Sequence, residues 1–263
     1  MEEHVPRVSI IIRTHQRPSY LVQALHSLAG QKYKDFEIVI VEDGLPASQP
    51  VIAKFDYLNI NYIYTGYSVG RSRAANIGLS HSKGKYINFL DDDDILLPTH
   101  VDSMVKVLDI YENVDVVHAA SIERKVRVAS SDPLVITTIS EKVKYNRPFD
   151  HKRIFFENMF PIQAAMFRRR LFEQYGGIDE SLELLEDWDL WIKYSMFCKF
   201  KYNDEVTSVF HVPGDKRKLR IRHQQLKQYE IKIINKYYDY IKQKNYKPIN
   251  KIKKLIERIQ HIF

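Results

Sequence analysis

Four consecutive aspartates, Asp91–Asp94, follow an apolar, strand-like run at residues 86–90. Adjacent carboxylates repel one another, so the run costs stability unless water screens the charges or a cation neutralises them. A divalent cation held by these oxygens could in turn hold a polyphosphate. A structural interpretation is also open, because acids favour a solvated turn or the first turn of a helix, and Asp94 is suited to cap the helix predicted after Pro98. The rest of the chain must decide between the two.

Two other groups of residues could take part in the same chemistry. Asp43, between Glu42 and Gly44, ends a second apolar run, where its carboxylate could accept hydrogen bonds from a nucleobase or could form a turn. Arg71 and Arg73 follow a glycine, and a guanidinium there could reach a diphosphate or could face solvent. Each of these patterns is weak alone.

A parallel sheet would bring these residues together. Buried strand-like runs and amphipathic helical segments alternate in the first half of the chain, which is typical of strands joined by right-handed crossovers. The predicted strands are 8–12, 36–41, 61–64 and 85–90, and the predicted helices are 20–28 and 71–80. Ligands gather at the carboxyl ends of such strands. Arg13-Thr14, Glu42-Asp43 and Asp91–Asp94 follow three of those ends, so we expect them at one edge of the sheet.

The second half is less regular. Residues 121–160 have mixed charge and little periodicity, apart from a β-rich patch at 134–139. A helix is predicted from Arg168 to a Gly176-Gly177 stop. Another is predicted from Glu186, with a packing face formed by Leu190, Trp191, Tyr194 and Phe197. Acids at the start of that helix could satisfy free backbone N–H groups.

Composition predicts one α/β domain and an appendage. The chain has 263 residues, of which 44% are hydrophobic, enough to bury one sizeable core. We place the domain at residues 1–215 and the appendage at 216–263. The single cysteine, Cys198, excludes an intrachain disulfide and favours a reducing compartment. No run has the length of a membrane-spanning helix, and the N-terminus does not resemble a signal peptide. A cytoplasmic protein is expected.

The basic charge is concentrated in the appendage. Residues 216–263 carry 15 Lys and Arg against 3 Asp and Glu, a net charge of +12, whereas residues 1–215 have a net charge of −5. The last twelve residues form a basic amphipathic helical pattern whose apolar stripe is Ile252, Leu255, Ile256, Ile259, Ile262 and Phe263. This stripe could pack on the domain or on a second protomer, or it could attach the protein to the anionic inner face of the cell membrane.

Five motifs in order resemble the family 2 glycosyltransferases, over roughly residues 7–213. They are the 8–12 strand with Thr14, Glu42-Asp43-Gly44, the segment from Gly70 through Asn76 to Gly78, Asp91–Asp94, and Glu186-Asp187-Trp188-Asp189. The resemblance implies a GT-A fold, a Rossmann-like, mostly parallel sheet flanked by helices, with the appendage as a C-terminal helical extension. Arg13 stands where the family commonly has a proline, and Ala75 where it commonly has an arginine.

The resemblance also implies roles. Thr14, Asp43, Arg73, Asp91 and Asp92 would bind the nucleotide sugar, with a UDP-sugar as the expected donor. Asp93 would hold Mn²⁺ or Mg²⁺ against the diphosphate. Apart from the resemblance, His211 is a candidate additional ligand, because Mn²⁺ also accepts imidazole. Asp187 would be the general base in a single displacement that inverts the anomeric centre. Trp188 could wall an acceptor sugar, whereas the spacing of Trp191 favours the core.

The acceptor expected from this resemblance is a hydroxyl of a glycan or a lipid-linked glycan, in cell-surface polysaccharide synthesis. Two other functions remain open at this point. A nucleotidyltransferase that makes nucleotide sugars also needs a parallel sheet, a metal and carboxylates, but the loop at residues 13–18 contains no glycine for a phosphate loop. A nucleic-acid-binding adaptor could use residues 216–263, but it would leave Asp91–Asp94 and Glu186-Asp187 without a role.

Overall fold

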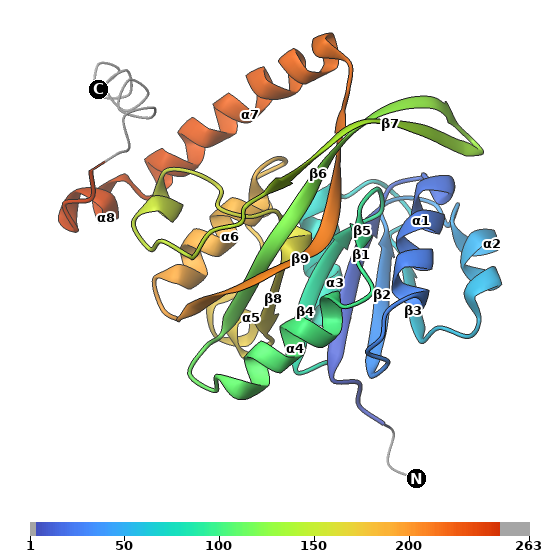
Figure 1. The fold of residues 1–263 in the computed structure, drawn as a ribbon, viewed down its shortest axis with the longest axis horizontal. Coiled ribbons are helices and arrows are strands. Elements are labelled where there is room, and N and C mark those ends of the chain that lie inside the picture. The colour runs from blue at the N-terminus through green and yellow to red at the C-terminus, as the bar shows by residue number, and fades with distance from the viewer. Residues whose placement is uncertain (1–3, 248–263) are drawn as a thin grey trace.

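The computed structural model describes residues 4–247 of the chain. Its centre is a nine-stranded mixed sheet in the order β3-β2-β1-β4-β8-β6-β9-β5, and β7 pairs with β6 outside this path (Figure 1). Helices cover both faces of the sheet, and the described part of the chain contains no helix long and apolar enough to cross a membrane.

The first half of the chain forms the parallel part of the sheet. Its strands are β1 (Val8–Thr14), β2 (Phe36–Glu42), β3 (Ile60–Tyr64) and β4 (Tyr86–Asp91). These strands pair in parallel, so that Arg13 lies beside Val41 on one side and Asp91 on the other. This register places the carboxyl ends of β1, β2 and β4 at one edge, as the sequence predicts.

Alternate strand residues build two cores. Ile10 and Ile12 face α1 (Pro18–Ala29) and α4 (His100–Ile110), whereas Ile11 faces α3 (Arg71–His81) on the other side of the sheet. Both faces of the central strands are buried, which explains why their sequences are continuously apolar. Smaller elements are α2 (Gln49–Ile52) and a 3₁₀ turn (Ala53–Phe55), between β2 and β3, and β5 (Ile95–Leu96), between β4 and α4.

The second half adds antiparallel pairs and the elements that close the site. These are β6 (Val116–Ser131), β7 (Leu134–Lys144), 3₁₀ turns at Arg153–Phe155 and Ile162–Ala164, β8 (Ala165–Arg168), α5 (Arg170–Tyr175), α6 (Glu186–Ser195) and β9 (Phe200–Pro213). Beyond the sheet, β6 and β7 continue as a long two-stranded ribbon (Figure 1). The β-rich patch at 134–139 is part of β7.

Two predictions for the second half need correction. Arg168 ends strand β8 and does not begin a helix, and the helix that stops at Gly176 is the shorter α5. Phe197 lies beyond the end of α6 and is 56% exposed, so it is not part of the packing face formed by Leu190, Trp191 and Tyr194. The aromatic ring of Phe197 stacks on Tyr175 instead.

The C-terminal extension is helical as far as it is described. It consists of α7 (Lys216–Lys236) and α8 (Tyr238–Gln243), and Ile233, Ile234 and Ile241 join the core on the α3 side of the sheet. The amphipathic stripe predicted at residues 252–263 lies outside the described residues.

Candidate active site

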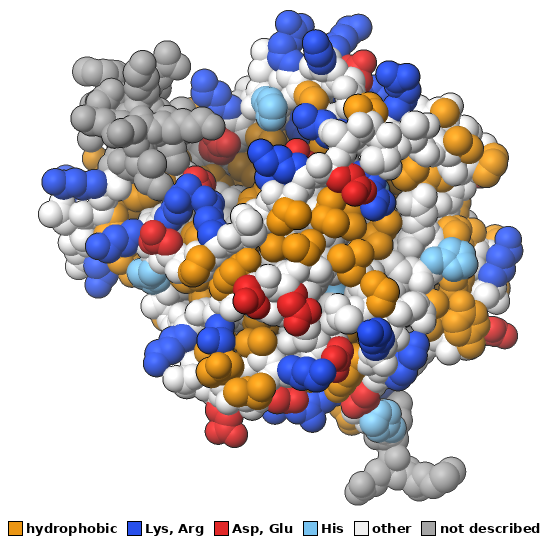
Figure 2. Space-filling view, viewed as in Figure 1, with side chains coloured by type: hydrophobic (Ala, Val, Ile, Leu, Met, Phe, Trp, Pro, Cys, Tyr) orange, Lys and Arg blue, Asp and Glu red, His pale blue; other side chains and the backbone are white. Residues whose placement is uncertain are grey.

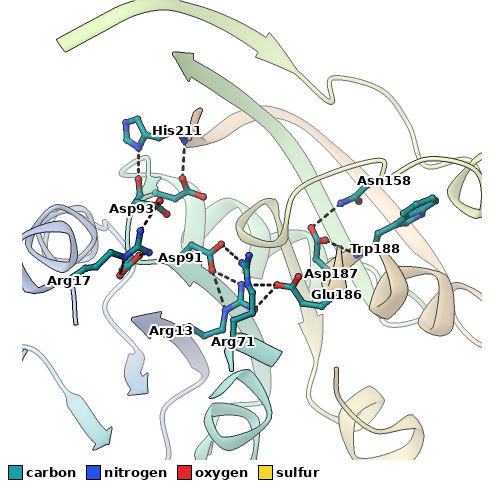
Figure 3. A network of polar contacts seen from close by, with 12 residues as sticks. Arg13, Arg17, Arg71, Asp91, Asp93, Asn158, Glu186, Asp187, Trp188 and His211 are labelled. Atoms are coloured by element: carbon teal, nitrogen blue, oxygen red, sulfur yellow. Dashed lines mark hydrogen bonds and ion pairs between the residues drawn. The ribbon is translucent and has the colours of Figure 1, made fainter. Parts of the chain in front are cut away.

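A cavity of about 480 Å³ opens at the carboxyl ends of β1 and β4. The acidic residues Asp91–Asp94 form one side, and Glu186 and Asp187, at the start of α6, form another. Strand β9 contributes His211, and the roof includes Arg222 from α7. Segments far apart in the sequence thus meet at the sheet edge that the strand pattern predicts (Figure 3).

The acidic run divides into a cluster and one separate side chain. Oxygen atoms of Asp91, Asp93 and Asp94 lie within 4.8 Å of one another, a spacing that could hold a metal ion. The Asp92 side chain is fully buried and accepts a hydrogen bond of 2.7 Å from the Thr14 hydroxyl. Burial, with Asp93 and Asp91 close by, raises the pKa of Asp92 to about 7 despite its ion pair with Arg17. The acidic run is therefore a structured part of the cavity wall and not a solvated turn.

The capping role predicted for Asp94 is wrong. Strand β5 separates it from α4, whose N-cap residue is Thr99. The Asp94 carboxylate instead accepts a hydrogen bond of 3.0 Å from the backbone N–H of His211. Burial, together with the neighbouring aspartates, raises its pKa well above the usual range.

His211 is attached to the acidic cluster. Its Nδ1 is hydrogen-bonded to the backbone carbonyl of Asp93, so Nδ1 carries the proton and Nε2 keeps its lone pair. Nε2 is buried and has no hydrogen-bond partner among the described residues. The ring is held with Nδ1 toward Asp93, so Nε2 points away from the three clustered carboxylates, and His211 is not part of the group whose ligand atoms lie within 4.8 Å of one another.

Two arginines link the acidic cluster to α6. Arg13, whose side chain is 5% exposed, donates to Asp91 at 2.5 Å and to Glu186 at 2.8 Å. Arg71 reaches the same two carboxylates at 3.1 Å and 3.0 Å, but its side chain is 39% exposed and lines the cavity. The two cations outweigh the effect of burial and hold the pKa of Asp91 at about 2.

The prediction for Arg73 does not fit its position. Arg73 is exposed and does not line the cavity, whereas Arg71 does. Residues two apart on a helix point about 200° apart, so only one of the two can face inward. The sequence could not show which one, because the rotation of α3 is set by its packing through Ala74 and Ala75.

Asp187 lies at the first turn of α6, across the cavity from the acidic cluster (Figure 3). Asn158 donates a 3.0 Å hydrogen bond to its carboxylate, and the backbone N–H of Trp188 donates another at 2.8 Å. Burial and the neighbouring Glu186 raise its pKa to about 6. The preceding residue, Leu185, has a left-handed backbone with φ of +59°, an uncommon conformation that sets the direction in which α6 starts.

Trp188 does not face an acceptor. It is 1% exposed, its indole N–H donates to the Ile154 carbonyl, and it belongs to the core beside Trp191, which is fully buried as its spacing predicts. The hydrogen bond explains how a tryptophan can be buried there without leaving its polar atom unpaired.

Asp43 lines the cavity but also holds a loop. Its carboxylate accepts hydrogen bonds from the backbone N–H groups of Val69 and Gly70, at 2.5 and 3.1 Å, and from the Ser68 hydroxyl at 3.0 Å. Gly70 has φ of +88°, which favours glycine, and α3 starts directly after it. A carboxylate has about four acceptor positions. One therefore remains for a ligand.

Sequence reasoning missed three residues of this site. Arg13, near the end of β1, was expected at this edge but was given no role, Arg17 lies just before α1, and Asn158 lies in the segment whose elements could not be predicted. Glu186 is part of a recognised motif, but only the structure shows that it binds two arginines. The sequence signal for Arg13 is that it stands where the family commonly has a proline, and the structure shows that this arginine pairs with Asp91 and Glu186.

We expect Arg13→Met to lower the free energy of unfolding by about 3 kcal/mol or more, because it removes a buried cation from between two carboxylates. The matched change, Arg71→Met, should cost about 1 kcal/mol or less, since Arg71 is partly solvated. Urea unfolding of both variants measures the difference. Equal, small changes would show that Arg71 alone neutralises Asp91 and Glu186.

Comparisons with known proteins identify the family of the chain. The sequence model described as Glycosyl transferase family 2 matches residues 9–176. An uncharacterized glycosyltransferase of Rickettsia prowazekii is 28% identical over 208 residues, which span 76% of this chain and 62% of that protein. The uncharacterized glycosyltransferase YwdF of Bacillus subtilis is 28% identical over 190 residues, 71% of this chain and 67% of that protein. The chain thus covers less than two thirds of the rickettsial relative.

Solved structures show the same fold. Residues 1–349 of TarS from S. aureus, in complex with UDP-GlcNAc, superpose with a TM-score of 0.63 at 18% identity, covering 81% of this chain and 60% of that one. A mannosyltransferase of Pyrobaculum calidifontis, in complex with GDP-Man and Mn²⁺, gives a TM-score of 0.67 at 18% identity, covering 90% and 65%. The family match favours the glycosyltransferase prediction over the nucleotidyltransferase and nucleic-acid-binding alternatives. The chain belongs to the family 2 glycosyltransferases and has their GT-A fold.

Proposed function

We propose that this protein is a metal-dependent, inverting glycosyltransferase that moves a sugar from a UDP-sugar to a hydroxyl of a glycan or lipid-linked glycan. The observation that carries the proposal is that one cavity contains two separate acidic sites. An acidic cluster suited to a cation and a diphosphate faces a separate buried carboxyl group whose pKa is about 6. Such a carboxyl group is ionised near neutral pH and can still accept a proton.

The residues present fit a divalent metal. Asp93 would be the main ligand, because it is the most exposed of the three clustered acids, and Asp91 and Asp94 lie close enough to assist. The three carboxylates suit Mn²⁺ or Mg²⁺ alike, and His211 would join them only if its ring turned, in which case an imidazole ligand would favour Mn²⁺. When bound, the ion would neutralise charge on the diphosphate and on the leaving group.

The donor would lie between β1, β2 and the acidic cluster. Asp43 would accept hydrogen bonds from the base, and Asp91 and Asp92, next to Thr14, would hold the ribose. Arg71 takes the phosphate role first assigned to Arg73, because its guanidinium already lies in the cavity and is partly free to turn. These assignments are supported by position, and by the UDP-GlcNAc and GDP-Man that similar proteins bind.

Asp187 would take the proton from the acceptor hydroxyl. As the proton moves to the carboxylate, the acceptor oxygen forms a bond to the anomeric carbon, and the bond from that carbon to the phosphate oxygen breaks. The nucleoside diphosphate leaves with the electron pair on the opposite face, so the anomeric centre is inverted. Asn158 keeps the carboxylate turned for this step by its 3.0 Å hydrogen bond.

The test is a panel of nucleotide sugars, with release of free nucleoside diphosphate as the readout. We expect slow hydrolysis of one UDP-sugar when Mn²⁺ is present and none after chelation. An anomeric assignment of the transferred product by NMR then decides inversion against retention. If no member of the panel is hydrolysed or transferred under any metal, the proposed activity is wrong.

A further inference from the structure

Helix α7 is divided into two halves with different surroundings. Its C-terminal half is docked, since Ile233 and Ile234 are buried and Lys236 pairs with Asp179 and Asp189 at 2.8 Å. Lys232 also donates to the Ser181 carbonyl. This end of the helix is part of the domain.

The N-terminal half of α7, residues 216–227, is strongly basic. We call it the cationic half-helix. It contains six lysines and arginines and no acid: Lys216, Arg217, Lys218, Arg220, Arg222 and Lys227. Each of the six is exposed, and none forms an ion pair with a described residue. Six like charges within twelve residues repel one another, so an anionic partner would relieve that repulsion.

The β6–β7 ribbon lies next to the cationic half-helix and is attached to the body at both ends. At its base, Gly214 N–H donates to the Val126 carbonyl, and at its tip the Ser19 hydroxyl donates to the Asp132 carboxylate. The ribbon and the half-helix also expose large aliphatic side chains, by 42% to 50%: Val128, Val135, Ile139, Val143 and Ile221. Val128 pairs with Ile136, the neighbour of Val135, so Val128 and Val135 lie on opposite faces of the ribbon, and Val128 lines the hollow beneath it. Figure 2 shows Lys and Arg side chains along the top of the molecule, with hydrophobic side chains near them over the ribbon.

The same half-helix borders the catalytic cavity. Arg222 and Leu226 line it, and Lys218 and Arg222 also line an adjoining hollow of about 460 Å³ beneath the ribbon. Whatever binds the outer surface of the half-helix is therefore held beside the mouth of the cavity.

We propose that the cationic half-helix and the β6–β7 ribbon form a surface that binds an anionic lipid bilayer and turns the cavity mouth toward it. Lipid phosphates would neutralise the cations, and exposed valine and isoleucine side chains would enter the interfacial region. A lipid-linked acceptor would then reach Asp187 from the membrane, a consequence that rests on the proposed function.

The observations favour a bilayer over other anions. A soluble polyanion would use the cations but has no need of exposed aliphatic side chains such as Val135 and Ile221. A single-stranded nucleic acid would use aromatic stacking platforms, and residues 216–227 contain no Phe, Tyr or Trp. Of these three partners, the bilayer surface matches both the charge and the aliphatic groups.

The test is cosedimentation of the full chain with vesicles of phosphatidylcholine, alone or mixed with phosphatidylglycerol. We expect binding to the mixed vesicles only, weakening between low and physiological salt. The triple variant Lys216→Glu, Arg217→Glu, Arg220→Glu changes outward cations that do not line the catalytic cavity. It should bind about tenfold more weakly or worse. The matched control changes three exposed lysines elsewhere, Lys32, Lys54 and Lys199, to Glu, and should bind like the wild type.

Three further measurements separate the contributions of the aliphatic contact, the charge and the enzymatic activity. Val135→Ser should weaken binding at high salt, where the aliphatic contact carries more of the affinity. A Gln version of the triple variant, with thermal unfolding as a check on folding, separates charge from any local effect on α7. Hydrolysis of the donor in solution should be unchanged in every variant, so loss of vesicle binding and failure of the proposed activity are distinguished.

Unchanged vesicle binding in the folded triple variant would overturn the proposal. It would do so even if another segment of the chain were then found to bind the vesicles. An equal loss in the control variant would show that only net charge matters and would also overturn it. So would binding of soluble polyphosphate or RNA that competes fully with vesicles and is insensitive to Val135→Ser.

Discussion

Asp187→Asn should lower the rate of sugar transfer about 100-fold or more, with the affinity for the nucleotide sugar nearly unchanged. The amide keeps the shape of the carboxylate and its contact with Asn158, but it cannot accept the proton of the acceptor. Because the proton moves only in the chemical step, the loss should appear in kcat and much less in donor binding. Steady-state transfer and calorimetric titration of the donor measure the two quantities separately.

Asp189→Asn is the matched control. Asp189 lies two residues further along α6, but it is buried against α7 and α8, where it binds Lys236 and Tyr237. It should affect stability and leave the chemical step intact. If Asp187→Asn transferred sugar at a near wild-type rate, the base would have to be another group, and Glu186 would be the first to test.

The pH profile gives an independent measure of the same role. The base must be ionised to work, and the pKa of Asp187 is raised to about 6, so kcat should fall about tenfold per pH unit below that value and be flat above it. Glu186 raises this pKa, whereas Asn158 and Arg71 lower it. Asn158→Ala should therefore move the acidic limb to higher pH, and the limb should be absent from the residual rate of Asp187→Asn.

Asp93→Asn should weaken metal-supported binding of the nucleoside diphosphate at least tenfold, or about 1.4 kcal/mol. Two phosphates that face Asp91, Asp93 and Asp94 are repelled unless a cation lies between them. The change removes the anionic ligand with the most room to meet that cation. Titration calorimetry with Mn²⁺, with Mg²⁺ and with a chelator measures the effect.

Asp102→Asn, on α4 and outside the cavity, is the control and should bind like the wild type. The wild-type protein in chelator should bind as weakly as Asp93→Asn does with metal. Equal affinity in all of these conditions would remove the metal from the proposal. His211→Ala should cost less than Asp93→Asn if the imidazole is a supporting ligand.

Several features of the site depend on contacts that are distant in sequence. Arg13 and Glu186 are 173 positions apart, and the hydrogen bond between them forms only when α6 packs against the edge of the sheet. Trp188 follows Asp187 directly, but the turn of α6 sends one side chain to the core and the other to the cavity. The ribbon of β6 and β7 has little periodicity because most of β7 is exposed and is not selected for a buried face.

The sequence by itself determined the parallel half of the sheet and the place where its chemistry gathers. Buried strands need continuously apolar runs, and polar residues at their carboxyl ends must share one edge, so Thr14, Asp43 and Asp91–Asp94 could be brought together from the pattern alone. Only the tertiary structure decided that Arg71 and not Arg73 faces the cavity and that Arg13 joins Asp91 to Glu186. It also decided that Asp94 accepts a hydrogen bond from the backbone of His211 and does not cap a helix. The reason is physical. A strand pattern reports the burial of neighbouring residues, whereas the rotation of a helix and the partner of a charged side chain depend on how elements distant in sequence pack together.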